Sequence, residues 1–220
     1  MLIGQPVDEN IDVGLAIKEG KEVSVDVFSG SSVISAGSPT GKIEKIGTLL
    51  APLAQLEVGT IRCVGLNYVQ HAHETKLDIP TVPTIFMKPN TALADPSAPC
   101  IIPKHVVSTD SCDYESELAI VIGKTAKNVS EEDAADYILG YTACNDVSSR
   151  VAQFAQSQWS YSKGFDGACP IGTFFIICLD HKLEINSNFR TNSCLSFFCE
   201  AYLTSYQRFE ERQSTTRLWH

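Results

Sequence analysis

Two glutamates, Glu115 and Glu117, stand two residues apart at the start of an apolar run in the segment CDYESELAIVIG. Side chains alternate along a β-strand, so a strand here directs both carboxylates to the same face. Two like charges side by side destabilise each other unless a partner neutralises them. A hard divalent cation such as Mg²⁺, Mn²⁺ or Ca²⁺ takes oxygen ligands of this kind. Spacing alone favours the alternative, a solvated strand face.

Asp146 and Lys163 are of residue types that suit the same site. Asp146 ends the run YTACND, where its carboxylate can add a third oxygen ligand, although a cap for the following helix is the alternative for this residue alone. Lys163 precedes Gly164 in YSKGFDG, a place where the backbone can approach a ligand closely. The alternative for Lys163 is an ordinary surface lysine.

His71 and Glu74 form a third candidate group within NYVQHAHET. On a helix they lie three positions apart and therefore share a face. A carboxylate that orients an imidazole makes a general base able to activate water. The alternative is a surface charge cluster, to which we assign His73 because it points elsewhere on such a helix.

The elements that must position these residues are short. Residues 13–20 and 21–28 are predicted to be two strands that meet in a hairpin at Glu19 and Gly20. Other strands are predicted at 61–65, 117–123 and 141–146, and helices at 67–75, 131–139 and 148–158. Many short strands with few helices predict a β-rich α+β fold.

Three regions differ in composition. Residues 1–56 are predicted to be a small N-terminal β unit, and residues 57–172 carry the candidate site. All 14 glycines and all 10 prolines of the 220-residue chain lie before residue 173. Since 48 residues of average composition contain roughly six of these two types, residues 173–220 are predicted to be a separate tail.

Charge and composition exclude several classes of partner. The net charge of −9 argues against nucleic acid and against anionic membrane surfaces. No apolar run approaches the roughly 20 residues that cross a bilayer. The N-terminus resembles neither a secretory signal nor a transit peptide, and the eight cysteines form no CxxC pair. We therefore expect free thiols and a cytoplasmic location, with mitochondria as the alternative.

The motifs together resemble a known family. The segments GLNYVQHAHE, PTIFMKP, DYESELAIVIG, GYTACNDVSSRVAQ and SKGFDGACPIG occur in this order over residues 60–172. They resemble the catalytic domain of the fumarylacetoacetate hydrolase family, in its branch of small acylpyruvases, oxaloacetate decarboxylases and hydroxyheptadienedioate isomerases. The resemblance implies a mixed β-roll of the fumarylacetoacetase C-terminal type and a homodimer.

The resemblance also implies a role for each candidate residue. The metal ligands, with Mg²⁺ or Mn²⁺ as the ion and Ca²⁺ as a further option, would be Glu115, Glu117 and Asp146. The groups that activate water and stabilise developing negative charge would be His71, Glu74 and Lys163. The groups that contact the substrate would be Arg150, Gln153 and Lys88.

The activity that follows is metal-dependent cleavage of a carbon–carbon bond in a small 2-oxo or 2,4-diketo acid. One alternative is an oxaloacetate decarboxylase or isomerase that uses the same site. Another is a catalytically impaired relative that keeps the metal site, because the family's later motifs are missing after CPIG (169–172). This departure predicts a β-roll that is incomplete at its C-terminal end.

Overall fold

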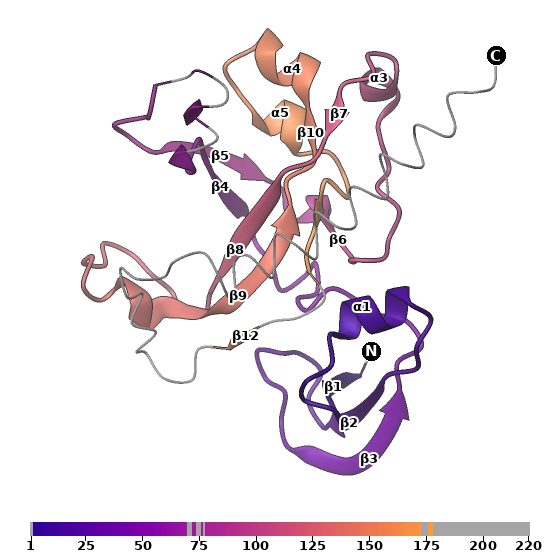
Figure 1. The fold of residues 1–220 in the computed structure, drawn as a ribbon. Helices are drawn as coiled ribbons and strands as arrows, with labels where there is room; N and C mark the ends of the chain where they lie inside the picture. Colours follow the sequence, from indigo (N-terminus) through magenta and orange to yellow (C-terminus); the bar gives the residue numbers. More distant parts are fainter. Residues whose placement is uncertain (1, 70–71, 74–75, 77, 173–175, 178–220) are drawn as a thin grey trace, which may run out of the picture.

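A computed structural model describes residues 2–69, 72–73, 76, 78–172 and 176–177. Strands in this part of the chain form five small sheets, and the helices are short (Figure 1). The N-terminal sheet has the order β1-β2-β3, all antiparallel, with bounds Ile3–Pro6, Ser24–Phe28 and Pro39–Lys45. No later strand among the described residues pairs with it.

The first predicted hairpin is wrong, because residues Val13–Lys18 form the helix α1. The side chain of Asp12 caps this helix by accepting a hydrogen bond from the Leu15 amide at 2.8 Å. Gly20 ends it at φ +75°, a left-handed conformation that favours glycine. Ala16 is buried in the middle of the helix. A local cap and a C-terminal glycine thus outweigh the β-branched residues that suggested a strand.

The larger part of the fold is built around two antiparallel pairings. Strand β4 (Ile61–Gly65) pairs with β5 (Thr84–Lys88), and β8 (Ser116–Ile122) pairs with β9 (Ile138–Asn145). The strands predicted at 61–65, 117–123 and 141–146 are therefore confirmed, with β9 starting three residues early. In β8–β9, Glu117 lies opposite Cys144 and Ser116 opposite Asn145.

Short elements connect these strands. Two-residue strands form a parallel pair, β6 (Leu93–Ala94) with β11 (Cys169–Pro170), and an antiparallel pair, β7 (Cys112–Asp113) with β10 (Ser148–Ser149). The helical elements are η1 (Asn90–Ala92), α3 (Lys104–Val107), α4 (Arg150–Ala155) and α5 (Ser160–Lys163). Helix α4 confirms the central part of the helix predicted at 148–158.

The helix predicted at 131–139 is mostly wrong. Only one 3₁₀ turn forms there, η2 (Ala134–Tyr137), and Ile138 already begins β9. Ser130 Oγ accepts from the Asp133 amide at 3.2 Å, but Asp133 is the N-cap residue of η2 and no side chain among the described residues caps this turn. Pairing of Ile138 with Ile122 in β8 outweighs the local helical preference.

A third strand joins β8 and β9 beyond the composition change. Strand β12 (Ile176–Ile177) pairs antiparallel with β9 and gives the sheet order β12-β9-β8. These two residues belong to the predicted tail, yet they extend the sheet. The sheet therefore continues past residue 173, where the composition changes.

The core lies where the sheets meet. Leu53, Ala92, Cys169 and Ile171 form a buried cluster, and Val33 and Ala51 from the N-terminal region pack against it. The described residues contain no helix long and apolar enough to span a bilayer. Mixed sheets with few helices agree with the predicted β-rich fold.

Candidate active site

The β8–β9 register brings the predicted acidic residues to one end of the sheet. The Asp146 amide donates to the Glu115 carbonyl at 2.9 Å, so the two residues face each other across the strand ends. Side chains along β8 alternate between half-buried and exposed, and Glu115 and Glu117 both lie on the half-buried side. The predicted common face of the two glutamates is therefore present.

Lys163 links two of these carboxylates. Its Nζ lies 2.8 Å from Glu115 Oε1 and 3.0 Å from Asp146 Oδ2, and it donates to Ser148 Oγ at 2.6 Å. The Lys163 side chain is almost fully buried. Helix α5 ends at this lysine, and Gly164 follows because a Cβ there would lie 2.4 Å from the Ser160 carbonyl oxygen. The ammonium ion thus bridges Glu115 and Asp146.

Arg150 holds the other side of Glu115. Its Nη1 contacts Glu115 Oε1 at 2.5 Å and donates to Gln153 Oε1 at 2.9 Å. Its Nε and Nη2 both lie 2.8 Å from Asp113 Oδ2. Burial raises the pKa of Glu115, but the charges and hydrogen bonds of Lys163 and Arg150 outweigh burial and hold this pKa below its usual value. Glu115 is therefore an ionised acceptor for two cations.

Glu117 has the opposite electrostatic environment. Burial raises the pKa of Glu117 to about 7 despite hydrogen bonding from Tyr68, and the charges of Glu115 and Asp146 add to the rise. Burial and the charge of Glu117 in turn raise the pKa of Tyr68 to about 12. Glu117 is thus a carboxylate whose charge a nearby cation would stabilise.

Lys88 is a fully buried lysine in the wall of the site. Its side chain has no exposed surface, and its Nζ lies 2.7 Å from Asp146 Oδ1. The same ammonium donates to the carbonyl of Lys163, to that of Ala168 at 2.7 Å and to that of Val147 at 3.5 Å. These protein groups use every N–H bond of the Lys88 ammonium.

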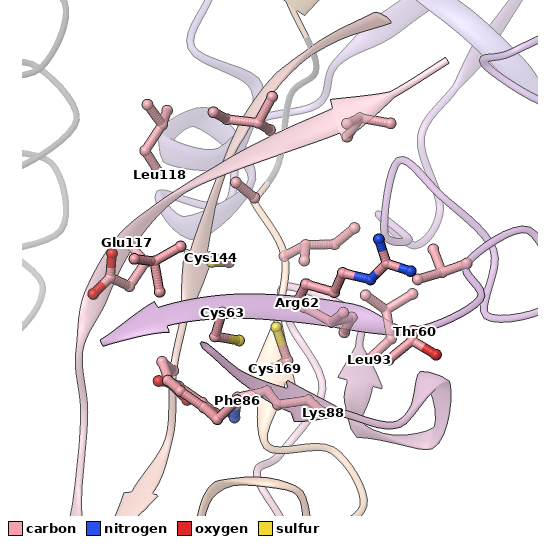
Figure 2. A pocket seen from close by; sticks show the side chains of 18 of the residues that line it. Thr60, Arg62, Cys63, Phe86, Lys88, Leu93, Glu117, Leu118, Cys144 and Cys169 are labelled. Atoms are coloured by element: carbon pink, nitrogen blue, oxygen red, sulfur yellow. The ribbon is translucent and has the colours of Figure 1, made fainter. Parts of the chain in front are cut away.

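A cavity of about 640 Å³ opens beside these groups. Glu115, Glu117 and Asp146 line it, and so does Lys163. Figure 2 shows the side chains of Cys63, Phe86, Lys88, Glu117, Cys144 and Cys169 around this cavity. The cavity thus combines a carboxylate cluster with apolar and aromatic walls, as small-molecule sites commonly do.

The aromatic wall is tightly packed. Phe86 and Trp159 meet edge to face with ring centroids 5.6 Å apart. Lys163 Nζ lies 5.4 Å from the centroid of the Phe86 ring. Trp159 also lies against Gly65, where a Cβ would be 2.4 Å from a ring carbon. The wall therefore joins β4 and β5 to helix α5.

The donor set suits a divalent metal ion, although the side chains are not arranged as a finished metal centre. The three predicted carboxylates line one cavity, and among the described residues no group makes an aligned hydrogen bond to the buried Asp146 Oδ1. In the same part of the chain, no three His, Cys, Asp or Glu side chains converge closely enough to hold an ion. The Lys163 ammonium instead bridges Glu115 and Asp146.

The structure brings most predicted site residues together. Glu115, Asp146, Lys163, Arg150, Gln153 and Lys88 form one connected network of ion pairs and hydrogen bonds. Glu117 lines the same cavity. The predicted dyad of His71 and Glu74 lies outside the described residues.

Two members of the network, Asp113 and Ser148, were not predicted from the sequence. Asp113 binds Arg150, and Ser148 accepts from Lys163 and lies within 3.4 Å of Glu115 Oε1. Asp113 lies two residues before Glu115, so strand alternation was a signal for its position on the same side. Ser148 lies within the quoted motif GYTACNDVSSRVAQ, but no spacing rule distinguishes it from Ser149.

Comparison with known proteins gives one family match. The model of the fumarylacetoacetate (FAA) hydrolase C-terminal domain matches residues 60–193. This range covers all nine predicted site residues and continues past residue 172, where the sequence analysis placed the end of the catalytic domain.

Individual relatives agree with this match. A caffeoylpyruvate hydrolase of Neonothopanus nambi is 47% identical over 167 residues, which are 74% of this chain and 58% of the relative. A mitochondrial oxaloacetate tautomerase of Xenopus laevis is 43% identical over 63% of this chain and 44% of its own length. The chain thus spans about half the length of these curated relatives.

A solved structure supports the fold as well. The crystal structure of 2-hydroxyhepta-2,4-diene-1,7-dioate isomerase from Mycobacterium marinum superposes with a TM-score of 0.58 at 34% identity. The superposition covers 72% of this chain and 57% of that structure. The superposed part of the chain therefore has a fold similar to that of this isomerase.

Proposed function

Because the chain belongs to the fumarylacetoacetate hydrolase family, in its small acylpyruvase-like branch, we propose that it is a metal-dependent enzyme that cleaves a carbon–carbon bond of an acylpyruvate, a small 2,4-diketo acid. The observation that carries this proposal is the buried Lys163 ammonium, which contacts both Glu115 and Asp146 at the cavity wall. The relative named for hydrolysis of an acylpyruvate supports the choice of substrate class.

We propose that Glu115, Glu117 and Asp146 hold the ion, with Mg²⁺ or Mn²⁺ preferred and Ca²⁺ as a third option. Carboxylate oxygens are the ligands that these ions favour. The raised pKa of Glu117 supports the assignment, because a cation stabilises a carboxylate that burial and neighbouring charges destabilise. When bound, the ion supplies Lewis acidity toward the oxygens of a 2-oxo acid.

The chain's own residues divide the remaining tasks. Lys163 carries the positive charge that stabilises an enolate as the carbon–carbon bond breaks. Arg150 fixes the orientation of Glu115 from the opposite side, and Gln153 in turn fixes Arg150. The predicted dyad, in which Glu74 orients His71 for deprotonation of water, stays a proposal that rests on the sequence motif.

Isomerisation or decarboxylation of a 2-oxo acid is the second candidate function. It is favoured by the relatives named oxaloacetate tautomerase and 2-hydroxyhepta-2,4-diene-1,7-dioate isomerase. The same cationic network stabilises an enolate in these reactions too, whereas only hydrolysis requires an activated water. The two candidates therefore differ in their need for His71.

Parallel assays test both candidates. Purified chain is incubated with Mg²⁺ and an acylpyruvate, and separately with oxaloacetate, and loss of the enol absorbance and release of product are followed. We expect Mg²⁺-dependent cleavage of the acylpyruvate, absent in Glu115→Ala and unchanged in the surface variant Lys45→Ala. Conversion of oxaloacetate alone would favour the second candidate. Metal binding without turnover of either compound would indicate the impaired relative considered above.

The finer fold and the assembly are also proposals. We propose a β-roll that is incomplete at its C-terminal end, a homodimer, and a cytoplasmic location. The apolar side chains of β8 that are exposed in the single chain support association with a second copy, namely Leu118, Ile120 and Ile122. Light scattering coupled to size-exclusion chromatography tests the dimer, and a monomeric mass at micromolar concentration would refute it.

A further inference from the structure

We propose that Lys88 is a positioning residue that holds Asp146 and the backbone of Lys163 in register, and that it does not contact the substrate. The inference rests on the proposed metal site, to which Asp146 belongs. It departs from the role in substrate contact that the family resemblance suggested for Lys88.

The burial of Lys88 sets the first condition on its role. Lys88 has no exposed surface, whereas a lysine normally keeps its ammonium in water. A buried charge persists only where protein groups replace its hydration. Lys88 therefore needs a complete set of partners inside the protein, and a substrate in the cavity could reach it only by displacing one of them.

The Lys88 ammonium has protein partners for all of its N–H bonds. An ammonium has three N–H bonds. Lys88 directs them at the carbonyls of Val147, Lys163 and Ala168, while Asp146 Oδ1 lies 2.7 Å away as its counter-ion. No donor of the Lys88 ammonium is left for a ligand.

The partners of Lys88 belong to two separate segments of the chain. Asp146 and Val147 follow β9, whereas Lys163 and Ala168 lie on either side of the turn after α5. The two segments also pair directly, since the Val147 amide donates to the Ala168 carbonyl at 3.0 Å. Lys88 comes from β5 and so ties both segments to a third element.

A functional consequence follows from this connection. Lys163 Nζ reaches Asp146 Oδ2 at 3.0 Å, and Lys88 contacts both the carboxylate of Asp146 and the carbonyl of Lys163. Lys88 thereby sets the position of the metal-ligating carboxylate relative to the catalytic ammonium. Outer partners of metal ligands typically change metal affinity by about 10- to 100-fold when removed.

The test measures Mn²⁺ affinity by calorimetry for the full chain and for Lys88→Met and Lys88→Gln. Methionine keeps the length of the side chain and removes its charge, while glutamine keeps a donor for the carbonyls. We expect Mn²⁺ to bind about 10- to 100-fold more weakly to both variants. The matched control is Lys45→Met, the same exchange at an exposed lysine paired with Glu22, and it should bind Mn²⁺ as the parent does.

Activity provides a second measurement. Because Lys88 does not contact substrate, the variants should lose kcat at saturating Mn²⁺ while KM for the acylpyruvate changes less than twofold. A rise in KM with unchanged kcat would instead show substrate binding and would overturn the inference. Mn²⁺ affinity of a folded variant within twofold of the parent would overturn it too.

A measurement on the parent chain covers the case in which neither variant folds. The side-chain ammonium of Lys88 is followed by NMR with ¹⁵N-labelled lysine during titration with diamagnetic Mg²⁺. We expect its resonance to shift with the same midpoint as Mg²⁺ binding, because its counter-ion becomes a metal ligand. An unmoved resonance in a chain that binds Mg²⁺ refutes the role of Lys88 alone, and absence of Mg²⁺ and Mn²⁺ binding refutes the metal site as well.

Discussion

The ammonium of Lys163 lies 2.8 Å from Glu115 Oε1, in a position that a metal ion bound to Glu115 would have to share. The same ammonium reaches Asp146 Oδ2 at 3.0 Å. A lysine that bridges two proposed metal ligands repels a cation at the same carboxylates. Lys163 and the proposed ion therefore compete electrostatically, although the proposed reaction uses both.

Lys163→Met should separate metal binding from catalysis. Removal of the ammonium takes away a cation that repels Mn²⁺, while Arg150 and Lys88 still hold Glu115 and Asp146 in place, so Mn²⁺ should bind about tenfold more tightly. Turnover of the acylpyruvate should fall about 100-fold or more, because the developing negative charge loses its stabilising cation. Calorimetry and steady-state kinetics measure the two effects. Weaker Mn²⁺ binding in a folded Lys163→Met variant would contradict the competition.

Arg150→Lys should show that the planar guanidinium is required. Arg150 contacts Asp113, Glu115 and Gln153 through three nitrogens, whereas an ammonium is a single point charge. We expect the free energy of unfolding to fall by about 1.5–3 kcal/mol, the range for hydrogen bonds to charged groups. Urea denaturation gives this value, and a midpoint equal to that of the parent chain would refute it.

Gly65→Ala should destabilise the aromatic wall of the cavity. The new Cβ would lie 2.4 Å from Trp159 Cζ3, so the indole ring must move. Overpacking of this kind costs about 1–3 kcal/mol. The control is Gly59→Ala, where no atom lies within 4 Å of the added Cβ. Thermal melts of the two variants give the comparison, and equal losses of stability would argue against a packed Trp159.

Cys63 should resist alkylation at mildly alkaline pH. Burial raises the pKa of Cys63 to about 12, and the negative charge of Asp146 adds to the effect. Only the thiolate reacts, and at pH 8 a thiol of this pKa is ionised to about one part in 10⁴. Iodoacetamide labelling followed by peptide mass analysis should therefore find Cys63 largely unmodified when exposed Cys112 has reacted. Rapid labelling of Cys63 in the folded chain would contradict the raised pKa.

The strand β8 could be predicted because its pattern is simple. Residues 117–123 form a short, largely apolar run that ends in Gly123, which favours a strand. The exposure of its alternate side chains, Leu118, Ile120 and Ile122, is not contained in that run. Residues 13–18 were misassigned because the signal that decides their structure lies just outside them, in the Asp12 cap. The segment 131–139 was misassigned because pairing of Ile138 with β8 is a long-range contact that a local pattern does not contain.

The site shows the same division between local and long-range information. Strand alternation predicted a shared face for Glu115 and Glu117, and residue type and position suggested the other acidic and basic candidates. The family motifs alone supplied Arg150, Gln153 and Lys88. None of these sources reveals that Lys88 is fully buried while Lys45 is exposed, because burial of a lysine depends on carbonyls from distant segments. The network around Arg150 likewise requires the β7–β10 pairing, which joins residues far apart in the sequence.

Strand β12 also protects the sheet to which it belongs. By pairing with Tyr141 and Gly140, Ile176 and Ile177 cover backbone groups of β9 that would otherwise form an open edge. Open edges recruit other chains and promote aggregation. A chain shortened at Gly172, where the composition changes, would expose this edge of β9, the strand that leads to Asp146. The short stretch after the last glycine therefore shields part of the β9 edge.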